Sequence, residues 1–420
     1  FGQAEVSEKK EIAIFQLGYS GWAIPLETLS TIDIEIQRVF LDLGRFSIFG
    51  MEKRFATRDV DEFIRILKGI KERTFELPEK YQFYESFLTE AEFERLIGAF
   101  IIAVPVVTSF DSQFVNGKEW QTNIKTNVSF IDVASGKLMG IANVESSGTS
   151  RETQYKSIQS AIDGIPMTLQ YEIRKIPEFQ ISTGVLGTVG GEIKIQLGSN
   201  MGIKPGDEYK VVVGGSYEGF KDEREVGLIL IKEVGPEVST GIIRYSSIKV
   251  DKGVQLREIP RLGVNMDVYA HSYTYLEGQA NKASSFLIGA RFELTRGVYD
   301  VHPYLAVQVL ADLGKWLPLS AVAGAQYCIY ARRLEFGIRG GLAAGSNALI
   351  QILNEEFNST DDPWFTHVGV SAGAYLSYLV TRDLKVFAEV QADYLFGILT
   401  DEIFGSYGGY QIGAGVSFKL

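Results

Sequence analysis

The chain has 420 residues, of which 45% are hydrophobic and 22% are charged, and its formal net charge at pH 7 is −11. This composition supports several folded domains and excludes wholesale disorder. The acidic balance, without any run of five Lys or Arg, argues against a nucleic-acid partner, because phosphates require a basic surface.

The sequence also limits the kinds of site that we expect. It has no stretch of 18 apolar residues, so we expect no transmembrane helix. Its single cysteine, Cys328, excludes an intrachain disulfide and a CxxC zinc site. The three histidines, His271, His302 and His367, are more than 30 residues apart, so a histidine metal site would require the fold to bring them together. The start at Phe1, without a Met or an apolar leader, is typical of a mature or trimmed chain.

Residues 1–176 predict an α/β domain. Short apolar runs predict buried strands, and apolar residues three and four positions apart predict amphipathic helices. The expected elements, in chain order, are a strand at 11–17, a helix at 26–43, a strand at 45–49, helices at 60–70 and 81–96, strands at 100–108, 119–132 and 137–147, and a helix at 151–175. Pro177 is expected to end this unit.

Three phrases of this domain resemble the CsgG family and the related TolB-type N-terminal domains. They are EIAIFQL (11–17), LGRFSIFGMEKRF (43–55) and SFIDVASGKLMG (129–140), and a long closing helix follows them. The resemblance covers about 165 residues and implies a periplasmic domain of a kind that often forms rings. The chain lacks the lipidated N-terminal cysteine and the amphipathic hairpin insertions of CsgG, so we do not expect a CsgG-type pore.

Residues 177–262 are dense in glycine and β-branched residues, and they predict a small all-β module, either a barrel or a sandwich. The phrase GEIKIQLGSNMGIKPGDEYKV (191–211) resembles the C-terminal domain of the flagellar assembly protein FlgT. Gly198, Gly202 and Gly206 are expected to serve turns. A phosphate-binding loop is not expected, because no helix follows and the Lys-Ser/Thr pair of a P-loop is missing.

Residues 263–420 are poorer in charge than the rest: Asp, Glu, Lys and Arg make up about 16% of them, against about 26% of residues 1–262. Apolar and polar residues alternate here in eight runs of 11–15 residues, at 264–275, 284–295, 302–312, 319–330, 332–344, 365–379, 384–396 and 408–420. A tilted strand crosses a bilayer with about 9–11 residues. The pattern predicts a C-terminal eight-stranded antiparallel transmembrane β-barrel that resembles OmpA-type outer-membrane barrels.

The alternation assigns each side chain of these strands to one of two faces. The side chains expected to face the membrane are Phe286, Ile288, Phe292, Leu294, Leu334, Phe336, Ile338, Val386, Val390, Tyr394, Tyr410, Ile412, Val416 and Phe418. The polar side chains expected inside the barrel are Arg291, Glu293, Arg333, Glu335, Arg339, Lys385, Glu389 and Asp393. The aromatic residues expected near the two membrane interfaces are Tyr273, Tyr275, Tyr304, Tyr327, Tyr378, Tyr394 and Phe396.

These patterns predict a non-enzymatic scaffold or assembly protein of an envelope machine, flagellar or secretory. From the sequence we expect no catalytic, cofactor or metal site. We expect the protein to be oligomeric, with its barrel in the outer membrane of a diderm bacterium and its N-terminal domains in the periplasm. Its expected partners are membrane lipid and periplasmic proteins or further copies of the chain. Two alternatives stay open: an oligomeric secretion or transport pore, and a soluble lipocalin-like binding protein, because alternation alone does not distinguish inside from outside.

Overall fold

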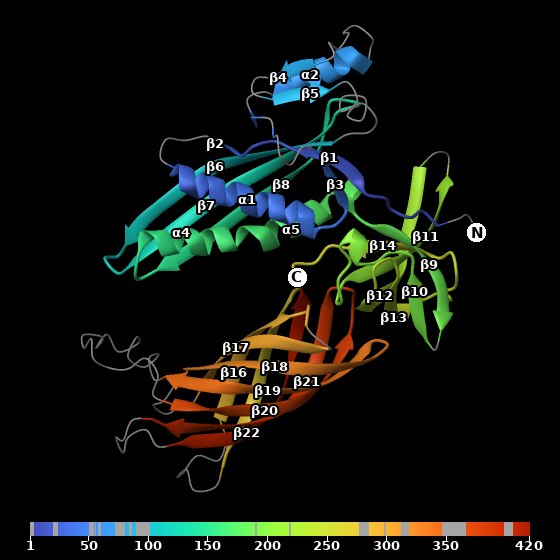
Figure 1. Ribbon diagram of the computed structural model, residues 1–420. Coiled ribbons are helices and arrows are strands. Elements are labelled where there is room, and N and C mark those ends of the chain that lie inside the picture. Colours follow the sequence, from blue (N-terminus) through green and yellow to red (C-terminus); the bar gives the residue numbers. More distant parts are fainter. Residues whose placement is uncertain are drawn as a thin grey trace.

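The computed structural model (Figure 1) describes residues 4–19, 24–49, 54, 56–57, 60–71, 80–83, 86–89, 101–189, 191–217, 220–276, 285–297, 300–311, 319–346, 367–398 and 406–420. In this part of the chain the structure is mostly β, with a mixed N-terminal sheet, two closed barrels and few helices. No helix among these residues is long and apolar enough to cross a membrane.

The N-terminal sheet has the strand order β3-β1-β6-β7-β8, and β2 lies beside β6. Strand β1 is parallel to β3 and β6, whereas β6, β7 and β8 form an antiparallel meander. The strands are β1 (Lys10–Ile14), β2 (Gly18–Tyr19), β3 (Phe46–Phe49), β6 (Ile101–Val115), β7 (Glu119–Asp132) and β8 (Lys137–Ser150).

Three helices cover one face of this sheet, namely α1 (Leu26–Asp42), α4 (Gln154–Asp163) and α5 (Ile165–Lys175) (Figure 1). In α1, Ile32, Ile36 and Phe40 recur every fourth residue, so they share one face, and all three are fully buried. Phe40 packs against Phe130 of β7, with ring centroids 6.1 Å apart. These side chains of α1 pack on the sheet and complete the apolar core between the helices and the sheet.

Two predicted helices differ from the structure. The helix predicted at 151–175 is two helices, because Gly164 ends α4 and Pro166, which cannot donate a backbone hydrogen bond, lies in the first turn of α5. Two strands, β4 (Lys80–Phe83) and β5 (Ser86–Thr89), overlap the helix predicted at 81–96, and they form an antiparallel pair. Aromatic side chains there favour strands. Residues 90–96 lie outside the described residues, and α2 (Val60–Lys71) lies where a helix was predicted.

The second unit is a closed six-stranded barrel, called the small barrel below, with the order β10-β13-β12-β11-β14-β9. Its strands are β9 (Ser182–Val189), β10 (Glu192–Ile195), β11 (Glu208–Tyr217), β12 (Phe220–Val234), β13 (Ser239–Ser246) and β14 (Gln255–Ile259). The short helices η2 (Pro177–Phe179) and η3 (Ser199–Met201) precede β9 and β11. Alternate residues such as Ile193, Ile195 and Ile231 fill its interior.

The loop between β10 and β11 needs glycine for two reasons. Gly202 and Gly206 have φ of 74° and 89°, in the left-handed region that other residues rarely adopt. A Cβ on Gly202 would lie 1.9 Å from the carbonyl oxygen of Leu43, and one on Gly206 would lie 2.7 Å from that of Thr295. This loop therefore contacts both the N-terminal sheet region and the C-terminal barrel.

The third unit is a closed antiparallel barrel, called the large barrel below, in which each strand pairs with the next and β15 closes on β22. Its predicted eight strands are confirmed. They are β15 (Val264–Tyr275), β16 (Ser285–Leu294), β17 (Val301–Ala311), β18 (Leu319–Ala331), β19 (Leu334–Ser346), β20 (His367–Leu379), β21 (Leu384–Gly397) and β22 (Tyr407–Lys419). Figure 1 shows the small barrel seated at the end of the large barrel where the chain terminates.

Candidate functional site

The outer surface of the large barrel is apolar. Of the 14 side chains predicted to face the membrane, 12 are exposed, from 37% for Leu334 to 65% for Ile412, while Tyr394 and Val416 are half-buried. Further strands add exposed apolar side chains, such as Leu305, Ile329 and Leu376. Large contiguous apolar surfaces are rare on proteins that stay in water, so this face requires an apolar environment.

The interior of the large barrel is charged and internally paired. Arg291 donates to Glu389 at 2.8 Å and to Asp267 at 3.1 Å, and Arg339 also pairs with Glu389. His271 Nε2 lies 2.8 Å from the same Glu389 carboxylate. All five side chains are buried. Burial of unpaired charge is costly, so this mutual pairing is what permits a charged interior.

The remaining predicted interior residues lie on either side of this cluster. Lys385 Nζ is 3.2 Å from Glu335 Oε2, and Glu293 accepts from Asn265 at 3.2 Å. Asp393 accepts from Tyr273 at 2.8 Å, and Gln411 donates to its other oxygen. Seven of the eight predicted interior side chains are therefore buried inside the barrel.

Arg333 is the exception, and its predicted position was wrong. It lies in the turn before β19, and its guanidinium donates to the backbone oxygens of Leu379 and Val380. It also stacks on the ring of Tyr245 of the small barrel, 4.0 Å from the ring centroid. Arg332 ahead of it has φ of 55°, so the chain turns there and the alternation of the strand no longer applies.

Two of the aromatic residues predicted near the membrane interfaces do not lie on the outer surface. Tyr327, Tyr378 and Phe396 are exposed on the outer surface, whereas Tyr273 and Tyr304 are buried inside the barrel. The register explains the error, because Tyr273 shares the inward face of β15 with Asp267 and His271. Asp267 and His271 were not among the predicted interior residues, although the alternation of β15 places them on the same face.

A cavity of about 720 Å³ lies where the small barrel meets the large barrel. From the small barrel it is lined by Glu208, Lys232 and Arg244, and from the large barrel by Glu293, His302, Glu335 and Lys385, among others. Arg244 lies 3.7 Å from Glu335, so the two barrels also share charges across this junction.

A chain of buried ion pairs joins all three units. Glu258 of the small barrel accepts from Arg45 and Arg174 of the N-terminal unit, each at 2.7 Å. Burial alone would raise the pKa of Glu258, but the two guanidinium groups outweigh it and lower the pKa to about 2. Asp207 accepts from Arg174 at 3.2 Å and from Arg296 of the large barrel at 3.0 Å.

A second contact of the junction centres on Glu208, which pairs with Lys419 and lies 3.0 Å from Arg261. Burial raises the pKa of Glu208, but the charges of Lys419 and Arg261 lower it below its ordinary value overall. Arg261 also lies 2.7 Å from Asp383, in the turn between β20 and β21. The small barrel is thus fixed to the turns at one end of the large barrel.

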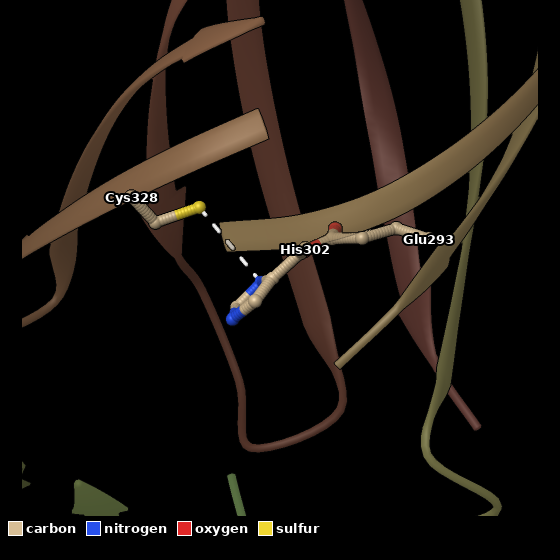
Figure 2. A group of neighbouring side chains, drawn as sticks. All are labelled: Glu293, His302 and Cys328. Atoms are coloured by element: carbon tan, nitrogen blue, oxygen red, sulfur yellow. Dashed lines mark hydrogen bonds and ion pairs between the residues drawn. The ribbon is translucent and has the colours of Figure 1, made fainter. Parts of the chain in front are cut away.

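At the same end of the large barrel, Glu293, His302 and Cys328 place three potential metal-ligand atoms within 4.8 Å of one another (Figure 2). His302 Nδ1 is 2.9 Å from Glu293 Oε1 and 3.9 Å from Cys328 Sγ. Glu293 was predicted inside the barrel, but His302 and Cys328 were not predicted to lie beside it. They come together because β16, β17 and β18 are neighbouring strands.

Several solved structures are similar to part of this chain. Neisserial surface protein A is 16% identical, over 38% of this chain and 97% of its own, with a TM-score of 0.29. The N-terminal β-barrel domain of Pseudomonas aeruginosa OprF is 19% identical, over 37% and 97%, with a TM-score of 0.25. The Yersinia pestis outer membrane protein Ail is 13% identical, over 37% and 99%, with a TM-score of 0.24.

No protein-family model matches the sequence, and no curated protein matches it. The geometry of the large barrel therefore carries the functional proposal.

Proposed function

We propose that this chain is an outer-membrane protein whose large barrel spans the bilayer and anchors the small barrel and the N-terminal sheet on the periplasmic side. The observation that carries the proposal is the polarity of the barrel, with an apolar outer face and paired charges inside. A lipocalin-like cup needs the opposite arrangement. Phe286, Ile338, Val390 and Ile412 point outward, so we do not propose a soluble binding protein.

The turns of the large barrel support this orientation. Outer-membrane barrels have short turns on the periplasmic side and longer loops outside. Arg332 and Arg333 form the turn between β18 and β19, and residues 380–383 connect β20 to β21. The small barrel contacts this same end, through Asp383 and Arg333. The end with short turns and the end that holds the other domains therefore coincide.

The interior supports an anchor in preference to a pore. Eight strands leave an interior just wide enough for side chains to fill it. Arg291, Arg339 and Glu389 meet across this interior and are buried. We therefore expect no conductance from the purified chain in planar bilayers, whereas stable channels would favour the oligomeric pore.

The finer proposal is that the two periplasmic units act as a scaffold in assembling an envelope machine, flagellar or secretory, and that the chain acts through binding and not as an enzyme. This rests on the resemblance of residues 11–17, 43–55 and 129–140 to the CsgG family and of residues 191–211 to FlgT. The rigid attachment to the anchor supports it, because Asp207 joins the N-terminal unit to the large barrel.

Fractionation of a diderm host that expresses the chain tests the anchor. We expect the protein in the outer-membrane fraction, resistant to alkaline extraction and soluble only in detergent. Protease added to intact cells should leave the N-terminal units whole, and it should remove them once the outer membrane is permeabilised. Release of the chain without detergent would contradict the anchor.

The scaffold role has a separate test. After cross-linking in native membranes and solubilisation in detergent, we expect complexes larger than one chain, composed of further copies or of periplasmic proteins. A detergent-solubilised monomer without partners, recovered from the outer membrane, would keep the anchor and contradict the scaffold.

A further inference from the structure

Glu293, His302 and Cys328 form a three-ligand cluster that the anchor role does not use. We propose that they bind one divalent transition-metal ion of the Zn²⁺ class inside the large barrel, at the end that faces the small barrel. Carboxylate oxygen, imidazole nitrogen and thiolate sulfur are the three ligand types that zinc uses in proteins. All three residues are buried, and each comes from a different strand (Figure 2).

The distances are compatible with this coordination. Zinc binds nitrogen and oxygen at about 2.0–2.2 Å and sulfur at about 2.3 Å, so the ligand atoms of a tetrahedral site lie about 3.3–3.6 Å apart. His302 Nδ1 is 2.9 Å from Glu293 Oε1 and 3.9 Å from Cys328 Sγ. These two distances differ from the tetrahedral values by a few tenths of an ångström, and the ligand atoms of Glu293 and Cys328 lie within 4.8 Å of each other, so they would move closer when Nδ1 of His302 and both of them bind one ion.

Neighbouring side chains hold the ligands in place. Asn265 donates to the second carboxylate oxygen of Glu293 at 3.2 Å, and the hydroxyl of Tyr375 lies 2.9 Å from Cys328 Sγ. Such outer hydrogen bonds orient metal ligands and tune their basicity. The amide nitrogen of Gln326 is 3.6 Å from the same sulfur.

Two buried oxygens point to a further ligand at this place. Asn265 Oδ1 and Gln326 Oε1 are buried and accept no hydrogen bond from the residues that the structure describes. Buried polar atoms are nearly always hydrogen-bonded. A water molecule in the fourth position of a zinc ion would donate hydrogen bonds to acceptors of this kind.

Charge and access also favour the ion. The Cys328 thiol gives its proton to solvent on binding, and the thiolate with the Glu293 carboxylate then balances the two positive charges, so the buried complex has no net charge. Glu335 next to it is already paired with Lys385 and Arg244. Glu293 and His302 line the cavity of about 720 Å³ at the junction, which provides the path of entry.

Cobalt substitution in the full, detergent-solubilised chain tests the site. Cys328 is the only cysteine, so a thiolate-to-cobalt charge-transfer band reports this site alone. We expect one Co²⁺ per chain, with this band and tetrahedral ligand-field bands, and displacement by Zn²⁺. Cys328→Ser should abolish the charge-transfer band, and His302→Gln should weaken binding at least about tenfold.

His367→Gln is the matched control, because His367 is also buried in the large barrel but begins β20, at the opposite end. It should bind Co²⁺ like the wild type. The folded state of each variant is checked by circular dichroism and by its mobility in unheated gels. Folded wild-type chain without the charge-transfer band would overturn the proposal, and so would equal affinity in His302→Gln.

Discussion

Two buried carboxylates each pair with two arginines. Glu258 accepts from Arg45 and Arg174, and Glu389 pairs with Arg291 and Arg339. Removing one partner of a buried ion pair leaves the other charge without compensation, which costs about 3–5 kcal/mol. These carboxylates are therefore the positions where a small chemical change has the largest expected effect.

The first prediction concerns Glu258 and pH. Its pKa in the folded chain is about 2, below the ordinary value of 4.5, so the unfolded chain takes up the proton first as the pH falls. The stabilisation is complete above about pH 4.5 and is lost as the pH falls toward 2, a change of about 3 kcal/mol. Glu258→Gln should destabilise the N-terminal units by about 3–5 kcal/mol at pH 7 and lose this acid dependence.

Urea unfolding of the full chain in detergent, followed by circular dichroism at pH 7 and pH 3, measures both effects. Glu172→Gln is the control, since Glu172 forms an exposed pair with Lys175 that contributes at most about 1 kcal/mol. An equal loss of stability between pH 7 and pH 3 in Glu258→Gln and in the wild type would show that Glu258 is not the responsible group.

The second prediction concerns Glu389. Glu389→Gln keeps the size of the side chain but removes the charge that Arg291 and Arg339 share, so we expect the large barrel to lose about 3–5 kcal/mol. Unfolding of the barrel in vesicles, followed by gel mobility without heating, measures the loss. Glu172→Gln, on α5 of the N-terminal unit, should leave the transition of the large barrel in place.

At the scale of elements, each strand of the large barrel has an apolar outer face and a polar inner face, and the outer face is the one proposed to contact lipid. Val390 lies in the middle of β21, and Val301 is the first residue of β17; both are exposed. An arginine on the lipid face costs about 2–4 kcal/mol at the midplane and about 0–1 near the interface. Val390→Arg should therefore destabilise the barrel in lipid vesicles more than Val301→Arg, in equilibrium unfolding by urea. Equal effects at the two depths would contradict a bilayer-spanning barrel.

The large barrel was the part most open to prediction from sequence, because a period of two assigns each side chain to a face once the strand is located. The inward direction of Arg291, Glu335 and Glu389 follows from this alternation. Arg333 was misplaced because a turn interrupts the alternation just before β19. The helix predicted at 81–96 failed because an apolar pattern over a short segment does not distinguish helix from strand.

The junctions were beyond prediction for a different reason. Asp207 lies in a glycine-rich loop for which the sequence predicts only turns, yet it pairs with Arg174 of the N-terminal unit and Arg296 of the large barrel. Such contacts depend on how separately folded units dock, and no local periodicity records them. The same holds for His302 and Cys328, which pairing of β17 with β18 brings together.

At the scale of the whole molecule, the loop before β11 connects the large barrel to the N-terminal sheet. Gly202 touches the end of α1 and Gly206 touches the turn after β16, while Asp207 accepts from Arg174 on one side and Arg296 on the other. The orientation of the N-terminal units relative to the large barrel is thus set by a few buried contacts. The proposed scaffold role would require such a rigid connection between the units.

The last prediction tests this coupling. Asp207→Asn keeps the shape of the side chain but replaces two charge-assisted hydrogen bonds with neutral ones, and each bond to a charged group contributes about 1.5–3 kcal/mol. We expect faster hydrogen exchange in the loop before β11 and faster proteolysis between the small and large barrels, with the strands of the large barrel unchanged. In a double-mutant cycle, Arg296→Gln should add little to Asp207→Asn, because the two residues share one interaction. Glu172→Gln should leave exchange at the junction as in the wild type, and additive effects of Asp207→Asn and Arg296→Gln would show that this pair does not hold the units together.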